Sequence, residues 1–240
     1  MNDTDDPGTN GDSISSDAAK IAGGSAVVLV GGIGERAIRL CTTWFLSGAL
    51  GTTGFGVYTF ATTVASILSA ISPVGTNTGI TMFGARYLGQ GEQGKLKGAL
   101  TGAFAVSLVT GPLFALGLYL AVEQGWLFSD RQAEALALKI GAGAVLFATP
   151  LAVAVGALIA AKDMRGQALG FQIALPGFTL LGCIVAVAMG AGFTGAMMAF
   201  AIAHGLALLI VATRAWGLFG PLLTNKAIEA KHSLKEMLAY

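Results

Sequence analysis

The sequence predicts an all-α fold, a bundle of six transmembrane helices in a polytopic membrane protein. Hydrophobic residues make up 54% of the 240 residues and charged residues only 11%, which is too few charges to solvate the surface of a water-soluble protein. Long uncharged runs lie between residues 39 and 86 and between residues 165 and 214. About 20 apolar residues cross a hydrocarbon core about 30 Å thick, so these runs leave room for several spans.

Residues 1–20 form an acidic segment before the first span. Five aspartates stand there among Gly, Ser, Thr and Asn, and Lys20 is the only base. This composition is typical of a disordered, solvated tail. The segment lacks the basic start and short apolar core of a cleaved signal peptide, so the first span is expected to act as the insertion signal.

Six spans follow within a predicted transmembrane lobe at residues 21–214. Their boundaries are expected at Ile21 to Leu46, Phe55 to Phe83, Leu100 to Val122, Ile140 to Ala161, Phe171 to Met189, and Gly192 to Thr213. Four of them contain or adjoin a proline, which removes a backbone hydrogen bond and usually bends a helix: Pro73, Pro112, Pro150 and Pro176.

The basic residues outside the spans predict the orientation. Only Arg131 and Lys139 fall on one side, whereas the other side carries Lys20, Arg86, Lys95, Lys97, Lys162, Arg165, Arg214, Lys226, Lys231 and Lys235. Basic loops favour the cytoplasmic side. Both termini are therefore expected in the cytoplasm, and residues 215–240 are expected to form a cytoplasmic linker.

Three charges interrupt the first span. Glu35 and Arg39 are four residues apart and Arg36 and Arg39 are three apart, so all three can share one broad face, with Glu35 placed to pair with Arg39. A charge at the centre of a membrane costs about 2.5–3.5 kcal/mol, so this face is expected to look into a protein cavity or a water-filled path, away from lipid. The excess positive charge suits an anionic group such as a phosphate, which the arginine fork binds well; the alternative is an ion pair beside an arginine that anchors the helix.

The same region imitates a dinucleotide fingerprint. Gly32-Ile-Gly34-Glu-Arg-Ala37 follows the apolar run Val27 to Val30, as the phosphate-binding turn follows a strand in nucleotide-binding folds. That fingerprint needs an acidic residue about 20 positions further on. The next acidic residue after Glu35 is Glu92, so the motif is interpreted as part of a membrane helix.

Two polar residues in later spans are candidates for a cavity or ion site. Asn77 could line a cavity or help to coordinate an ion, although such a residue more often bonds a neighbouring helix. His204 could relay protons, although a lone histidine is more often a satisfied packing residue. No catalytic arrangement, metal-ligand spacing or basic nucleic-acid surface appears in the sequence, so we expect neither an enzyme nor a nucleic-acid partner, and no metal or cofactor beyond coupling to a sodium ion or proton.

Several short motifs resemble a known transporter family. They are Leu50-Gly-Thr-Thr-Gly-Phe-Gly-Val-Tyr58, Gly75-Thr-Asn-Thr-Gly79 leading to Ala85-Arg-Tyr-Leu-Gly89, Pro150 with Ala160-Ala-Lys-Asp-Met-Arg165, and Pro176. Together they make residues 21–240 similar to the oligosaccharide flippases, the polysaccharide biosynthesis transporters of the multidrug/oligosaccharidyl-lipid/polysaccharide superfamily. Residues 84–94 also resemble the sister branch of multidrug and toxin extrusion proteins.

The resemblance implies a lobe of a two-lobe transporter in the plasma membrane. Such a lobe would flip an anionic lipid-linked oligosaccharide across the bilayer by alternating access, with Arg36 and Arg39 attracting its pyrophosphate and Glu35 tuning their charge. The family typically has two six-helix halves, so a second six-helix lobe is the expected partner. Two alternatives remain open: a cation-coupled drug exporter, in which Glu35 and Asn77 handle the coupling ion, and a half-length membrane protein that does not transport.

Overall fold

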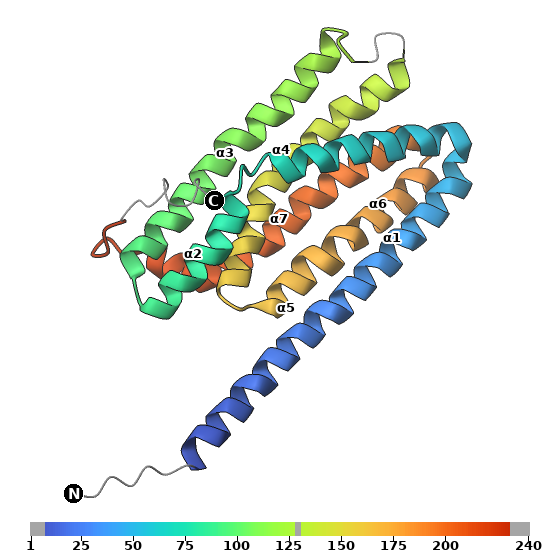
Figure 1. The fold of residues 1–240 in the computed structure, drawn as a ribbon. Helices are drawn as coiled ribbons and strands as arrows, with labels where there is room; N and C mark the ends of the chain where they lie inside the picture. Colours follow the sequence, from blue (N-terminus) through green and yellow to red (C-terminus); the bar gives the residue numbers. More distant parts are fainter. Residues whose placement is uncertain (1–7, 128–130, 231–240) are drawn as a thin grey trace, which may run out of the picture.

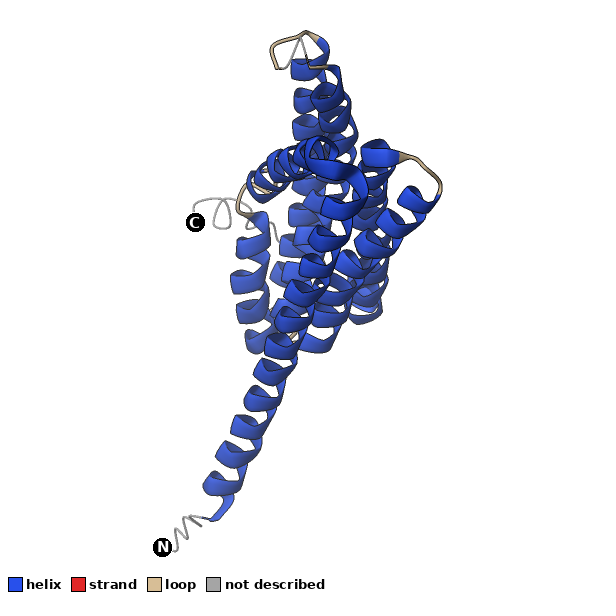
Figure 2. Ribbon diagram, turned by 90° about the vertical axis from the view of Figure 1, so that its right-hand side faces the viewer, coloured by secondary structure: helices blue, strands red, loops and turns tan. Residues whose placement is uncertain are grey.

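The computed structural model describes residues 8–127 and 131–230, with side chains from residue 23 onward. This part of the chain is helical and contains no strand (Figure 2). Its elements are the α-helices α1 (Gly8–Ile71), α2 (Thr76–Gln90), α3 (Gln93–Glu123), α4 (Gln132–Ala160), α5 (Met164–Gln167), α6 (Leu175–Ala188) and α7 (Gly192–Thr224), with the π-helix η1 (Ala168–Ala174) between α5 and α6. The all-α fold predicted from the sequence is confirmed.

Five helical segments of the described chain are long and apolar enough to cross a membrane: Gly23–Ile71, Gln93–Glu123, Gln132–Ala160, Met164–Ala188 and Gly192–Thr224. The first is two helices in succession, because Gly51 has φ 66° and ψ 176°, values far from a helix. Only glycine adopts this conformation readily. Figure 1 shows the chain reversing its direction there. We call residues 8–50 the first arm of α1 and residues 52–71 its second arm.

The second predicted span was wrong in one respect, because it is not continuous from Phe55 to Phe83. The helix stops at Ile71, four residues form a turn, and α2 begins at Thr76. Pro73 has no N–H to continue the helix, and Val74 and Gly75 have positive φ values of 50° and 77°. A hydrogen bond to α4 stabilises the turn, since the buried hydroxyls of Ser72 and Thr149 lie 2.6 Å apart.

The other three predicted proline bends divide into two groups. Pro112 and Pro150 lie inside α3 and α4, which continue as single helices around them. Pro176 stands in the first turn of α6, directly after the π-helix η1. Because Pro176 cannot donate to the carbonyl four residues earlier, the preceding backbone takes a wider turn, as π-helical segments do.

Helix α4 is the centre of the bundle. It packs against α7, α3, α1 and α2, and most of its apolar membrane-crossing stretch is buried. Small residues permit this close packing: a Cβ atom on Gly156 would lie 2.6 Å from the backbone oxygen of Asn77 in α2. The hydrophobic core therefore surrounds α4, and the other helices are arranged around it (Figure 1).

Both ends of the described chain differ from the sequence-based expectation. α1 begins at Gly8, so residues 8–20 are helical where a disordered tail was expected; residues 1–7 lie outside the described part. α7 runs to Thr224, well past residue 214, so the predicted linker starts as helix. Lys97 of α3 then donates hydrogen bonds to the backbone oxygens of Asn225 (2.7 Å) and Ile228 (3.2 Å).

Candidate functional site

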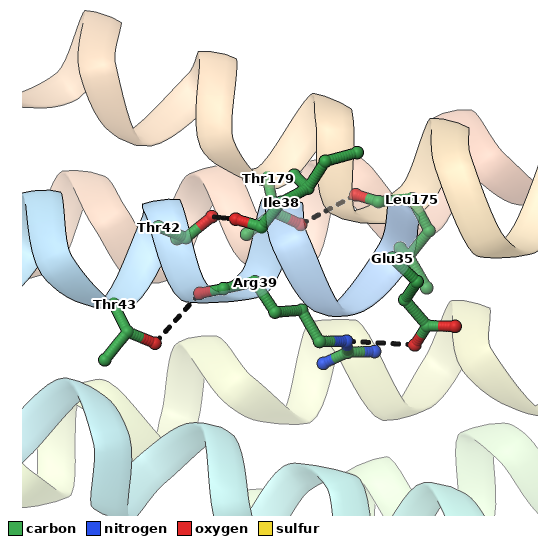
Figure 3. Close-up of polar contacts among 7 residues, drawn as sticks. All are labelled: Glu35, Ile38, Arg39, Thr42, Thr43, Leu175 and Thr179. Carbon is green, nitrogen blue, oxygen red and sulfur yellow. Dashed lines mark hydrogen bonds and ion pairs between the residues drawn. The ribbon is translucent and has the colours of Figure 1, made fainter. Parts of the chain in front are cut away.

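The charge cluster lies in the first arm of α1. Arg39 Nε donates a hydrogen bond of 3.0 Å to Oε1 of Glu35 (Figure 3), which confirms the pairing predicted from their spacing. The side chain of Arg39 is 58% exposed and that of Glu35 23%. The guanidinium of Arg39 therefore has donors left for a further group, because one Nε contact uses only one of its five N–H groups.

The glycines before this cluster serve helix packing. A Cβ atom on Gly31 would collide with the side chain of Gln172, and one on Gly34 would lie 2.9 Å from Cδ1 of Ile173. Both partners belong to η1. The glycine motif therefore brings the first arm of α1 against the π-helix, as small residues do at membrane helix interfaces.

A cavity of about 580 Å³ lies beside Arg39. Both arms of α1 contribute to its wall, together with α6 and α7. Hydroxyl side chains are frequent in the wall, and they are Thr42, Thr43, Tyr58, Thr59, Thr62, Thr63, Ser66 and Thr179. Arg39 is the only residue with a formal charge at neutral pH among those that line this cavity in the described part of the chain.

Most of these hydroxyls share one hydrogen-bonding pattern. They donate to carbonyl oxygens of their own helix, three or four residues earlier, at distances of 2.7–3.1 Å; the residues are Thr42, Thr43, Thr62, Thr63, Ser66 and Thr179. Figure 3 shows three of these bonds, from Thr42, Thr43 and Thr179. A hydroxyl has one hydrogen to donate and two lone pairs. Once its hydrogen is used within the helix, it can only accept from a ligand.

His204 adds to the same wall. It lies in α7, is buried to 9% exposure, and its Nδ1 is 2.8 Å from the backbone oxygen of Phe200. A carbonyl only accepts, so the hydrogen is on Nδ1, and Nε2 of the neutral ring is an acceptor. The ring also packs edge-on against Phe200, with 4.6 Å between the ring centroids.

The five site residues predicted from the sequence do not all meet. Arg39 and His204 line the cavity, but Glu35, Arg36 and Asn77 are not among its lining residues. Glu35 contacts Arg39 without lining the cavity, and Arg36 is exposed three residues before Arg39 on the same helix. Asn77 lies on α2, against α4, where its side-chain oxygen is 3.5 Å from the hydroxyl of Thr78.

The hydroxyl side chains that line the cavity, which we call the hydroxyl wall, were not predicted from the sequence. Its signal is present in the second arm, where Thr59, Thr62, Thr63 and Ser66 recur at helical spacing. Residues spaced by three and four share one helix face. The arrangement combines one cation with many acceptors, and so it suits a ligand that carries an anionic group next to groups rich in N–H or O–H donors.

A bundle of membrane-crossing helices with a polar cavity at one face has the architecture of a membrane transporter lobe. The chain belongs to the polysaccharide biosynthesis protein family, whose model matches residues 21–240. The resemblance noted in the sequence is thereby confirmed at the level of the family. No curated protein matches the chain.

Two solved structures share the fold. One is a MOP superfamily transporter from Pyrococcus furiosus, for which the reverse polarity of the binding pocket suggests a different function. It is 15% identical to this chain, with a TM-score of 0.75. The other is a multidrug resistance MATE family transporter of the MOP superfamily in an outward-facing conformation, 19% identical, with a TM-score of 0.71. Each alignment covers 91% of this chain and 50% of the other. The chain therefore spans about half the length of these transporters.

Proposed function

We propose that this chain is one lobe of a flippase that moves a lipid-linked oligosaccharide across the plasma membrane by alternating access. Its partner would be a second six-helix lobe, and both termini would lie in the cytoplasm, as the distribution of basic residues predicts. Arg39 would bind the anionic phosphate group that joins sugar to lipid. Arg36, exposed nearby, would attract the same group from a greater distance.

The observation that carries this proposal is the composition of the cavity wall. Arg39 is the one formally charged residue among the described residues of the wall, and the surrounding hydroxyl oxygens offer acceptors to sugar O–H groups. The hydrogen bond to Glu35 uses only one of the five N–H groups of the Arg39 guanidinium, so the others can bind a ligand. Membership of the polysaccharide biosynthesis family supports the same class of substrate.

A cation-coupled exporter of organic cations is the second candidate. The acceptor-rich wall would also suit a cationic ligand, and one of the structures with this fold is a multidrug transporter. In that case Glu35 would handle a sodium ion or proton, with Asn77 or His204 as further ion-site groups. Arg39 disfavours this candidate, because it places a positive charge where the cation would bind.

A binding experiment on the whole chain in phosphatidylcholine nanodiscs distinguishes the two candidates. A fluorescent polyprenyl-pyrophosphoryl disaccharide is compared with ethidium, an organic cation. The flippase proposal expects binding of the disaccharide lipid and a loss of about 10–100-fold in Arg39→Met, since a charge-assisted hydrogen bond contributes about 1.5–3 kcal/mol. Tighter binding of ethidium in Arg39→Met would favour the exporter.

Arg86→Met is the matched control. Arg86 is exposed on α2 and does not line the cavity, so its replacement removes the same charge elsewhere. Gel filtration and thermal unfolding of each variant establish that the fold is kept. Equal losses in Arg39→Met and Arg86→Met would contradict a role for the cavity.

A further inference from the structure

A second hollow of the bundle is apolar and adjoins the polar cavity. It has a volume of about 600 Å³ and lies between the second arm of α1 and the C-terminal half of α3. Every described residue that lines it is apolar, including Val64, Ile67 and Leu68 of α1 and Leu113, Phe114 and Gly117 of α3. We call it the apolar groove.

The groove and the polar cavity share one residue, Ile67. The second arm turns Thr59, Thr63 and Ser66 toward the cavity, and it turns Val64 and Leu68 toward the groove. These two sets occupy adjacent faces of one helix, since residues three and four apart align. Ile67 stands at the boundary and is itself exposed (56%). A polar and an apolar hollow therefore meet across a single side chain.

We infer that the apolar groove holds the hydrocarbon tail of the same lipid whose head group occupies the polar cavity. This inference rests on the proposed function and adds a tail site to it. An amphiphile needs both surfaces side by side: its charged and hydroxylated head binds at Arg39 and the hydroxyl wall, and its tail crosses Ile67 into the apolar groove. Because bilayer lipid is as apolar as the groove, van der Waals packing and attachment to the bound head group, rather than removal of apolar surface from water, would hold the tail there.

Gly117 allows the groove to be filled without disturbing the fold. It is exposed, lies inside α3, and a Cβ atom added to it would meet no heavy atom within 4 Å. Gly117→Leu therefore projects a side chain into the groove and favours the helix. Gly217→Leu is the matched control, because Gly217 of α7 is equally open and lines neither hollow.

The test uses two photoactivatable lipids with the same diazirine-bearing polyprenyl tail. One carries a pyrophosphoryl disaccharide head and the other a phosphocholine head. Each is added in trace amount to phosphatidylcholine nanodiscs that contain the whole chain, and the labelled peptides are mapped by mass spectrometry. We expect the disaccharide lipid to label residues 113–118 at least fivefold more than the phosphocholine lipid. Gly117→Leu should abolish this preference, and Gly217→Leu should keep it.

A third probe separates failure of the groove from failure of the proposed function. It is the pyrophosphoryl disaccharide on a short, water-soluble tail, whose binding reports on the polar cavity alone. If it binds and both photoactivatable lipids label the groove equally, the groove contacts only bulk lipid and the tail site is wrong. If it does not bind the wild-type chain, the proposed function and the tail site are both wrong. Labelling preference that persists in Gly117→Leu would also overturn the tail site.

Discussion

The hydroxyls of Ser72 and Thr149 lie 2.6 Å apart and fully buried, although 77 residues separate them in the chain. This contact joins the turn at residues 72–75 to the central helix α4. This hydrogen bond forms at the point where the backbone between the second arm of α1 and α2 leaves the helical path.

Ser72→Ala should lower the thermal stability of the chain in detergent. The change removes one buried hydrogen bond, whose net value is about 0.5–1.5 kcal/mol, and the expected fall in Tm is about 2–4 °C for each kcal/mol. Thr149 keeps its bond of 3.0 Å to the backbone oxygen of Val145, so no orphaned group adds to the loss. Ser47→Ala is the control, since Ser47 is exposed and bonds only within its own helix. A double-mutant cycle with Thr149→Val should give a coupling energy above zero; an additive cycle would contradict the contact.

Gly51→Ala should destabilise the reversal between the two arms of α1. The positive φ of 66° with ψ 176° is accessible essentially to glycine alone, so alanine costs about 1–3 kcal/mol there. Gly48→Ala is the matched control three residues earlier, in the helical part of the first arm with nothing near its Cβ position. It should be neutral or stabilise by up to about 1 kcal/mol. Thermal unfolding measures both, and the opposite order of stability would refute the assignment of the reversal to Gly51.

Arg39 and Arg36 should differ in their effect on binding of the polyprenyl-pyrophosphoryl disaccharide. Arg39 lines the cavity and Arg36 does not, so Arg36→Met loses only a long-range attraction, which dissolved salt screens. We expect a loss of about 10-fold or more for Arg39→Met and a smaller loss for Arg36→Met that fades as the salt concentration rises. Titrations in low and high salt measure both. Equal, salt-independent losses would show that both arginines contact the ligand.

Acidification should weaken the contact between Asp163 and Arg214. Burial favours the neutral acid, but hydrogen bonds from Arg214 and from the N–H of Gly166 outweigh it and hold the pKa of Asp163 below its ordinary value of 3.8. Because the folded-state pKa is lowered, the stabilisation is present above pH 3.8 and disappears as the pH falls through the folded-state value.

Asp163→Asn separates the contribution of the ion pair from that of the helix cap. Asparagine can still cap α5 by accepting from Gly166, so the variant loses mainly the charge facing Arg214 Nε at 2.9 Å. Arg214 is 59% exposed, so the effect should be only about 0.2–1 kcal/mol. Unfolding midpoints between pH 3 and pH 6 should fall more for the wild-type chain than for the variant. Parallel pH profiles would count against this contribution.

The positions of the membrane-crossing helices were largely predictable, because apolar length is the main determinant of a span. The path between spans was less so. The sequence predicts a connection over residues 47–54, yet the helix is interrupted at Gly51 alone. Conversely, the apolar run around Pro73 hides a break that depends on positive φ at Val74 and Gly75. A hydropathy pattern carries little information on the backbone torsions that decide either feature.

The charged residues of the candidate site could be predicted from the sequence, but the hydroxyl wall could not. The pairing of Glu35 with Arg39 follows from helical spacing within one element. Which arginine faces the cavity depends on how the first arm rotates against η1, and that depends on Gly31 and Gly34 meeting residues far along the chain. Threonine and serine are close to neutral in hydropathy, so the hydroxyl wall stands out only when both arms of α1 come together.

The intrahelical bonds of the hydroxyl wall have a consequence for chemical discrimination. A sugar whose hydroxyls are capped as methyl ethers keeps every oxygen but has no hydrogen to give. The oxygens of Thr62, Thr63 and Ser66 have already committed their own hydrogens to the backbone, and two acceptors facing each other form no bond. Such a surface would distinguish a free glycan from its O-methylated form without any difference in charge.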